Sequence, residues 1–183
     1  YPHGGAQSVF IGQQVNGGSY AYLVLAINLT GQTDVLLDFW WRGVGPNPLR
    51  GKTGVSISDD DGATWSQIAT LDRASQTYSH ALINIASAAQ ANNRALNNKF
   101  RVRIFYEGPT NTAAGDGLIV DDLRLSQRAN LIATFPYALD DFEQAAFRQG
   151  LYPQSAGNGG TQISTNYPHG GAQSVFIGQQ VNG

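Results

Sequence analysis

The chain has 183 residues, which allows one domain or one domain plus a fragment of another, and 42% of them are hydrophobic, enough for a substantial core. Its 11 Lys and Arg residues against 13 Asp and Glu residues give a net charge of −2, which excludes the basic surface needed to bind nucleic acid or an anionic membrane. There is no Cys, so disulfides, thiolate metal sites and a cysteine nucleophile are excluded. The longest apolar run, residues 20–27, is far shorter than the roughly 20 residues that span a bilayer. The absence of Met predicts that this is an excerpt or a processed segment of a longer protein.

A long exact repeat is the strongest feature of the sequence. Residues 1–17, YPHGGAQSVFIGQQVNG, recur unchanged as residues 167–183, so the two copies begin 166 residues apart. This spacing is far above the ~20–50 residues of solenoid repeats, and each repeating unit should therefore be a whole domain. One interpretation is a designed chain with a duplicated end. The interpretation that we favour is a tandem array of near-identical domains with a 166-residue period, excerpted out of phase.

Alternation of apolar and polar residues with a period of two predicts short β-strands along most of the chain. Only residues 86–96 have helical character, and an Asn pair should keep that helix short. Many short strands separated by Gly, Asn and Asp turns predict an all-β, antiparallel β-sandwich. The expected strands cover residues 7–12, 20–29, 35–42, 55–58, 65–71, 77–85, 100–106 and 118–125, with 55–58 and 65–71 forming a hairpin.

The domain boundary is predicted after the last of these strands. Residues 127–140 break the strand pattern and are interpreted as a linker. Residues 1–126 are then a sandwich that lacks its own first strand, and residues 141–183 hold the first strand and loop of the next unit. The strand expected over residues 141–148, with Phe142 buried, has three possible places: its own sandwich, a neighbouring sandwich to which it is donated, or a separate bead-like domain.

A resemblance to known families appears when the unit is read from residue 141. It opens with Asp141-Phe142-Glu143, continues through a GGAQS stretch, VLLDFWWRG, GVSISDDDGATWSQI and FRVRIFYEG, and ends with GLIVDDLRL. This order resembles jelly-roll domains of the MAM type and, more loosely, jelly-roll carbohydrate-binding modules. It is most similar to Cys-free versions found in bacterial surface proteins. The resemblance implies an antiparallel jelly-roll β-sandwich, with the first and last strands adjacent, outside the cell.

The same resemblance implies a structural calcium ion. In those folds acidic residues of the first and last strands bind Ca²⁺ together with backbone carbonyls, which implicates Glu143 and Asp121, with Asp122 and Asp141 as weaker candidates. Alternation along residues 118–125 places Asp121 on one face with Ile119, Leu123 and Leu125, an otherwise apolar face where an unpaired carboxylate is very costly. The alternative is that Asp121 caps backbone N–H groups at a β-bulge while Glu143 is solvated.

An Asp box lies in the predicted hairpin, where SDDDGATW matches the pattern S-x-D-x-G-x-T-W. Asp60 is expected to accept backbone N–H groups across the turn, Gly62 to supply a positive φ, and Trp65 to pack beneath. Sialidases carry several such boxes, one per propeller blade, but one box per 166 residues does not build a propeller. The set is therefore interpreted as stabilising a turn, and it comprises Ser58, Asp60, Gly62, Thr64 and Trp65.

Other residues with catalytic chemistry are sparse. No His pair has metal-ligand spacing and no Ser lies in a nucleophile elbow, so no catalytic residue is assigned and the chain is not expected to be an enzyme. Trp40 and Trp41 are neighbours on one strand, so one ring should face the core and the other should point outward. The outward ring is either a stacking platform for a sugar or part of a covered face.

The leading hypothesis is a structural one: a repeat unit of a long extracellular fibre or adhesin stalk at the cell surface. Its partners are neighbouring identical repeats or subunits, and its units are interlocked by strand exchange. The low content of charged residues, 13%, and the lack of oxidisable Cys and Met are consistent with an extracellular location. The alternative is a carbohydrate-binding module repeated for avidity, with a polysaccharide as its partner. Neither a nucleic-acid partner nor membrane insertion is expected.

Overall fold

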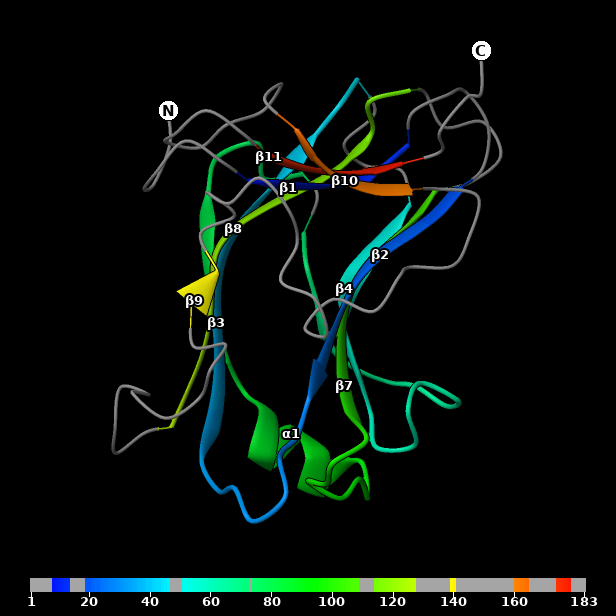
Figure 1. Ribbon diagram of the computed structural model, residues 1–183. Helices are drawn as coiled ribbons and strands as arrows, with labels where there is room; N and C mark the ends of the chain where they lie inside the picture. Colours follow the sequence, from blue (N-terminus) through cyan, green and yellow to red (C-terminus); the bar gives the residue numbers. More distant parts are fainter. Residues whose placement is uncertain are drawn as a thin grey trace.

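The computed structural model describes residues 8–13, 19–46, 51–72, 74–108, 114–127, 139–140, 160–164 and 174–178. These residues form two β-sheets that pack face to face, with one short helix at the end of the sandwich (Figure 1). All strand pairs of the described residues except one are antiparallel. The all-β sandwich predicted from the alternation is therefore confirmed.

The two sheets, here called sheet A and sheet B, differ in size. Sheet A has seven strands in the order β10-β11-β1-β8-β3-β6, with β9 beside β8, and sheet B has four in the order β2-β7-β4-β5. Sheet A contains β1 (Val9–Gly12), β3 (Val35–Val44), β6 (Ser79–Asn84), β8 (Gly117–Gln127), β9 (Leu139–Asp140), β10 (Gly160–Ser164) and β11 (Ser174–Gly178). Sheet B contains β2 (Ser19–Ile27), β4 (Lys52–Ser58), β5 (Ser66–Thr70) and β7 (Phe100–Gly108).

The hydrophobic core fills the space between the sheets. Buried and half-buried residues alternate along β3 from Val35 to Val44, as a strand with one face on a core requires. The facing strands of sheet B contribute every second side chain in the same way. The largest fully buried core side chains include Leu23, Leu37, Phe39, Ile57, Phe100, Ile104 and Tyr106.

The helix α1 (Ile85–Ala91) closes one end of the core. The side chain of Asn84 caps its first turn by accepting a hydrogen bond from the backbone N–H of Ser87 at 2.9 Å. Asn93 has a φ of 55°, a left-handed conformation that Asn tolerates and that ends a helix. The short helix predicted within residues 86–96 is therefore confirmed.

A one-residue bulge in β8 changes which of its side chains face the core. The register between β8 and β3 shifts at this point, and Asp122 has a φ of 50°. An extra residue in one strand reverses the alternation beyond it. The prediction that Asp121 and Leu123 share one face is therefore wrong. Val120 and Leu123 belong to the core, whereas Asp121 and Ile119 lie on the outer face of sheet A.

Both ends of the predicted linker 127–140 lie in sheet A. Strand β8 extends to Gln127, and β9 returns to pair with β8, with Leu123 opposite Asp140. The chain thus contacts the sandwich again directly before residue 141. The predicted strand 141–148, including Phe142, lies outside the described residues.

Two glycines bring β1 and β8 close together at the end of their ladder. Gly12 lies directly opposite Gly117, and the ring of Phe10 covers both. A Cβ atom on Gly117 would lie 2.7 Å from Cε2 of Phe10 and 2.5 Å from the backbone oxygen of Ile11. Because one of these neighbours is backbone, a side chain at Gly117 is accommodated only if the strands separate.

Gly117→Ala should therefore lower the free energy of unfolding by about 1–3 kcal/mol, the usual cost of overpacking. Urea denaturation measures the change. Leu82→Ala, which truncates a strand side chain that is 59% exposed, is the control and should change stability by no more than about 0.5 kcal/mol. Unchanged stability of Gly117→Ala would contradict the close approach of β1 and β8.

Candidate functional site

The loop between β4 and β5 carries the Asp box and is closed by hydrogen bonds to Asp60. One carboxylate oxygen, Oδ1, accepts from the Ser58 hydroxyl at 2.6 Å and from the backbone N–H of Thr64 at 2.9 Å. The other, Oδ2, accepts from the Thr64 hydroxyl. The backbone N–H of Gly62, whose φ is 89°, donates to Oγ of Ser58 at 2.9 Å. Trp65 packs against Gly62, so the five residues of the motif are in one connected turn.

The hydrogen bonds within the turn also fix the charge of its carboxylates. Donation from Ser58 and Thr64 lowers the pKa of Asp60 well below its usual range. The backbone N–H of Ala95 and the guanidinium of Arg94 lower the pKa of Asp59. Both groups are therefore carboxylates at neutral pH, held as acceptors of hydrogen bonds.

Arg94 connects this loop to the segment that follows α1. Its Nη1 lies 2.8 Å from Oδ1 of Asp59 and 2.8 Å from the hydroxyl of Thr64, and its Nε donates to Ser66 at 3.1 Å. Asn97 adds a hydrogen bond from Nδ2 to the backbone oxygen of Asp59 at 2.8 Å. The Arg94 side chain is only 16% exposed, and it holds the Asp-box loop against the main body of the sandwich.

Asp60→Asn should lower the melting temperature at pH 7, because the amide provides one acceptor oxygen where the carboxylate provides two. Since the folded-state pKa of Asp60 is below the ordinary value of 3.8, its stabilisation is present above about pH 4 and is lost as the pH falls towards the folded-state value. The gap between wild type and variant should therefore narrow in melting curves recorded from pH 7 down to pH 3. Asp72→Asn, the same change in another exposed turn, should leave the curves unchanged. A gap independent of pH would contradict a structural carboxylate.

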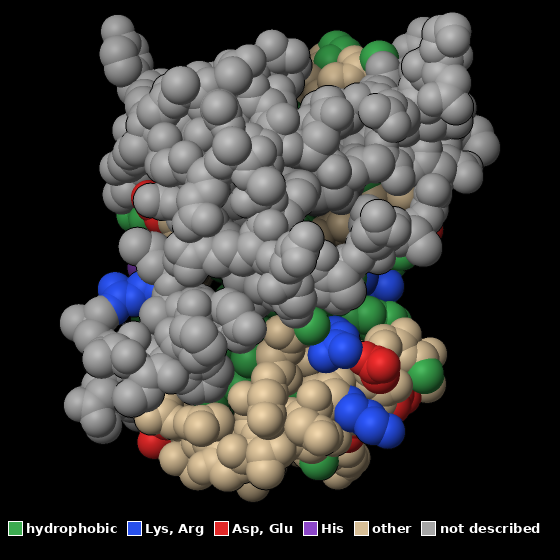
Figure 2. All heavy atoms as spheres, in the orientation of Figure 1, with side chains coloured by type: hydrophobic (Ala, Val, Ile, Leu, Met, Phe, Trp, Pro, Cys, Tyr) green, Lys and Arg blue, Asp and Glu red, His purple; other side chains and the backbone are tan. Residues whose placement is uncertain are grey.

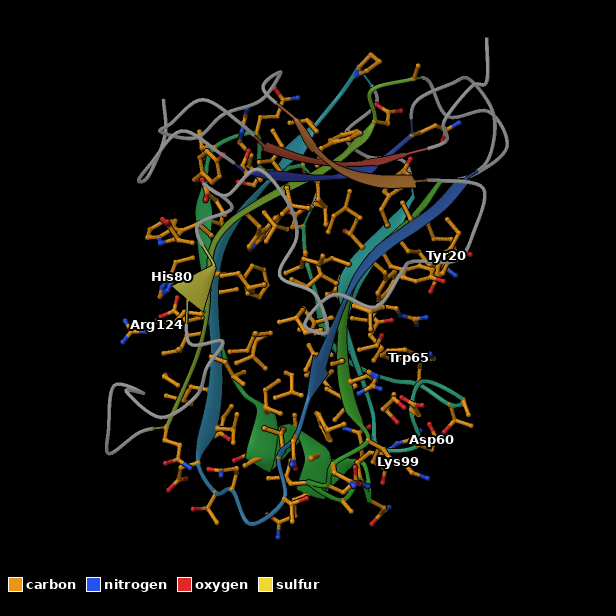
Figure 3. The ribbon with its side chains drawn as sticks, in the orientation of Figure 1. Tyr20, Asp60, Trp65, His80, Lys99 and Arg124 are labelled. Carbon is orange, nitrogen blue, oxygen red and sulfur yellow. The ribbon has the colours of Figure 1, made fainter. Side chains whose placement is uncertain are left out.

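A pocket of about 370 Å³ lies beside the Asp box on the outer face of sheet B. Tyr20 and Trp65 project from this face, away from the core, on the same side of the molecule as Asp60 (Figure 3). Lys and Arg side chains lie next to acidic ones on this side of the surface (Figure 2). Arg101 forms an ion pair with Asp61, and both residues line the pocket. The full lining is Tyr22, Val24, Asp61, Gly62, Trp65, Arg101 and Arg103.

Arg103 is the residue around which aromatic rings gather in this pocket. Its guanidinium carbon lies 4.3 Å from the centre of the Trp65 ring and between 5.3 and 5.8 Å from the rings of Phe105, Tyr20 and Tyr22. Its Nε is buried and has no hydrogen-bond partner among the residues that the structure describes. Burial lowers the pKa of Arg103 from its ordinary value, although the nearby tyrosines oppose the shift.

The sequence analysis did not identify this cluster around Arg103. Tyr20 and Tyr22 alternate along β2, and Arg101 and Arg103 alternate along β7, which places each pair on one face of its strand. The missing information was the pairing of these distant strands, in which Tyr22 lies opposite Phe105. Outward-facing aromatic and Arg residues on two strands were the signal available in the sequence.

Trp40 and Trp41 lie on opposite faces of β3. Trp41 is 7% exposed and belongs to the core, so it is not available to stack on a sugar. Trp40 lies on the outer face of sheet A, where its ring is 4.9 Å from the ring of His80. Nε2 of His80 is in turn 2.7 Å from Oδ1 of Asp38. Of the two predicted stacking residues, only Trp40 remains a candidate.

Asp121, the main predicted calcium ligand, lies at the bulge of β8. Its side chain is fully buried, and its Oδ1 accepts the backbone N–H of Asp122 at 2.7 Å, which is the contact of the bulge alternative. Its charge acts on a neighbouring phenol: burial first, and Asp121 second, raise the pKa of Tyr78 to about 12. No three His, Cys, Asp or Glu side chains gather as a metal site in the described part of the chain. Glu143 and Asp141 lie outside that part, so the calcium ion stays a prediction.

The calcium prediction is tested by melting curves. If Ca²⁺ bridges Asp121 and Glu143, excess chelator should lower the melting temperature and added calcium should restore it, because an ion that binds only the folded state stabilises it. Glu143→Gln should abolish the response, whereas Glu107→Gln, at an exposed position of β7, should preserve it. A midpoint that is the same with chelator and with calcium would exclude the ion.

Comparison of the chain with family models, curated proteins and solved structures finds no match. Among the described residues, the helix α1 spans seven residues, and no helix has the length and apolar character needed to cross a membrane. The function is therefore argued from the geometry of the strands and of the pocket.

Proposed function

We propose that this chain is a jelly-roll repeat unit of a long extracellular fibre or adhesin stalk, with successive units interlocked by strand exchange. The strand orders β1-β8-β3-β6 and β2-β7-β4-β5 support the jelly roll, because consecutive strands from β1 to β8 alternate between the two sheets everywhere except at the β4–β5 hairpin. Units of one kind joined in series give length and regular spacing, which suits a stalk.

The observation that carries the proposal is the pairing of the two copies of the repeated segment. β1 belongs to the first copy and β11 to the second, and they are adjacent, parallel strands of sheet A. Val9 pairs with Val175 and Ile11 with Ile177, so equivalent positions of the two copies lie side by side. A strand 166 residues later in the chain thus covers the edge of β1, whose backbone groups otherwise lack partners.

The neighbours of β1 and β11 support such an exchange. β1 lies between β8 and β11, whereas β11 lies between β1 and β10. Because the two copies are identical, a copy inside a continuous array has two suitable neighbours, a strand equivalent to β8 and one equivalent to β10. The edge of β1 can therefore pair with a hairpin like β10–β11 from its own unit or from the next unit. Strand exchange requires that both pairings are possible.

The return of the chain at β9 bears on the strand predicted over residues 141–148. Leu139 and Asp140 pair with β8 immediately before that segment. This pairing supports a place for the strand beside this sandwich, and it is less compatible with a separate bead-like domain, which would leave the connection free of the sheet.

The alternative function, a carbohydrate-binding module repeated for avidity, is favoured by aromatic side chains on the outer faces of the sheets. Trp40 lies on sheet A, and Tyr20, Tyr22 and Trp65 lie on sheet B. A polysaccharide pull-down tests carbohydrate binding, because a chain that serves only as a spacer retains nothing.

The strand-exchange proposal predicts that Ile177→Pro exposes β1. Proline removes a backbone donor and is not accommodated in the interior of a sheet, so β11 should separate from β1. Hydrogen exchange of the β1 amides at residues 9–11 should then accelerate, while residues 102–106 in the core of sheet B should remain protected. Ile163→Pro is the matched control and should leave exchange at residues 9–11 unchanged, because β10 pairs with β11 and lies one strand further from β1. Unchanged exchange at residues 9–11 in Ile177→Pro would contradict the pairing of the two copies.

A further inference from the structure

The pocket beside the Asp box has no part in the interlocking of units, and its electrostatics point to a ligand. Two arginines near it are already neutralised, since Arg101 pairs with Asp61 and Arg94 pairs with Asp59. Arg103 makes no ion pair with any residue that the structure describes. Arg103 thus offers a positive charge that forms no direct ion pair with a described carboxylate, although the charge of Glu107 acts on it from a distance, and this suits a ligand with a single negative charge.

The planar guanidinium of Arg103 favours a planar anion. Its carbon lies 4.3 Å from the centre of the Trp65 ring, and a guanidinium carries its N–H donors in its own plane. Within the described part of the chain these donors have no acceptor, and one of them, Nε, is buried without a hydrogen-bond partner. A carboxylate matches this edge with two parallel N–H···O bonds.

The remaining walls favour a ring that bears hydroxyl groups. Val24 and Tyr22 present apolar surface, and Asp61 at the rim has carboxylate oxygen atoms that accept hydrogen bonds from hydroxyls. The volume, about 370 Å³, is within the range of small-molecule sites. A sugar has apolar C–H faces for the walls and hydroxyls for the rim, and one with a carboxylate also supplies the charge.

We infer that this pocket binds a carboxylated sugar, namely a uronic acid residue of an acidic polysaccharide, with the carboxylate on Arg103. The inference goes beyond the structural role and does not depend on it. A stalk whose units each carry such a site attaches weakly at many points, and avidity makes the sum strong.

Calorimetry with a galacturonic acid trisaccharide tests the inference, and the methyl-esterified trisaccharide is the matched probe without charge. The acid should bind, and the ester should bind at least tenfold more weakly. Arg103→Gln should weaken binding of the acid roughly ten- to a hundredfold, as expected for loss of charge-assisted hydrogen bonds. Arg103→Lys keeps the charge without the planar fork and should fall between the two. Arg124→Gln makes the same change in charge on the outer face of sheet A and should bind as wild type (Figure 3).

Three results would overturn the inference: equal binding of acid and ester, wild-type affinity in both Arg103 variants, or no binding of the acid at millimolar concentration. Tighter binding of a peptide with a free carboxyl terminus would assign the pocket to peptides and would also overturn it. Melting curves of both Arg103 variants show whether they are folded, and Arg103→Lys carries the test if Arg103→Gln is not. Exchange at residues 9–11 is independent of all these results, so failure here is distinct from failure of the strand-exchange proposal.

Discussion

Adjacent residues of a β-strand point to opposite faces, and this alternation decides the surroundings of nearly every side chain in the sandwich. It buries Trp41 and leaves Trp40 on the outer face, although the two are neighbours in sequence. It also places Arg103 outside the core while Val102 and Ile104 on either side lie within it. The core and the candidate site are therefore built on opposite faces of the same strands. A shift of a strand that repacks the core would also move the side chains of the site.

The alternation was readable from the sequence, because it is local, and so were the sandwich, the Asp-box hairpin and the short helix. The bulge was not. Asp122 adopts a positive φ that its sequence context does not demand, and this one residue moves Asp121 to the opposite face from Leu123. The aromatic cluster also escaped, because Tyr22 and Arg103 come from distant strands whose register is set by tertiary pairing.

The Asp box links a structural motif to the candidate site. Its hydrogen bonds fix the loop, and Arg94 ties the loop to the segment after α1. Trp65, the last residue of the motif, is thereby held between Gly62 and the guanidinium of Arg103. Trp65 forms a wall of the pocket, and the Asp-box turn already restrains the rotamer of this side chain.

The parallel contact between β1 and β11 has a further consequence when many units follow one another. In the array that we propose, every unit offers the same hairpin, so a hairpin displaced by one whole unit makes the same backbone contacts as the correct one. Such a displacement resembles a dislocation in a crystal. Its local cost in free energy is small, but every later unit is displaced in the same way until the array ends. Order in the proposed fibre would then depend on sequential folding during synthesis, with each unit closing before the next copy emerges.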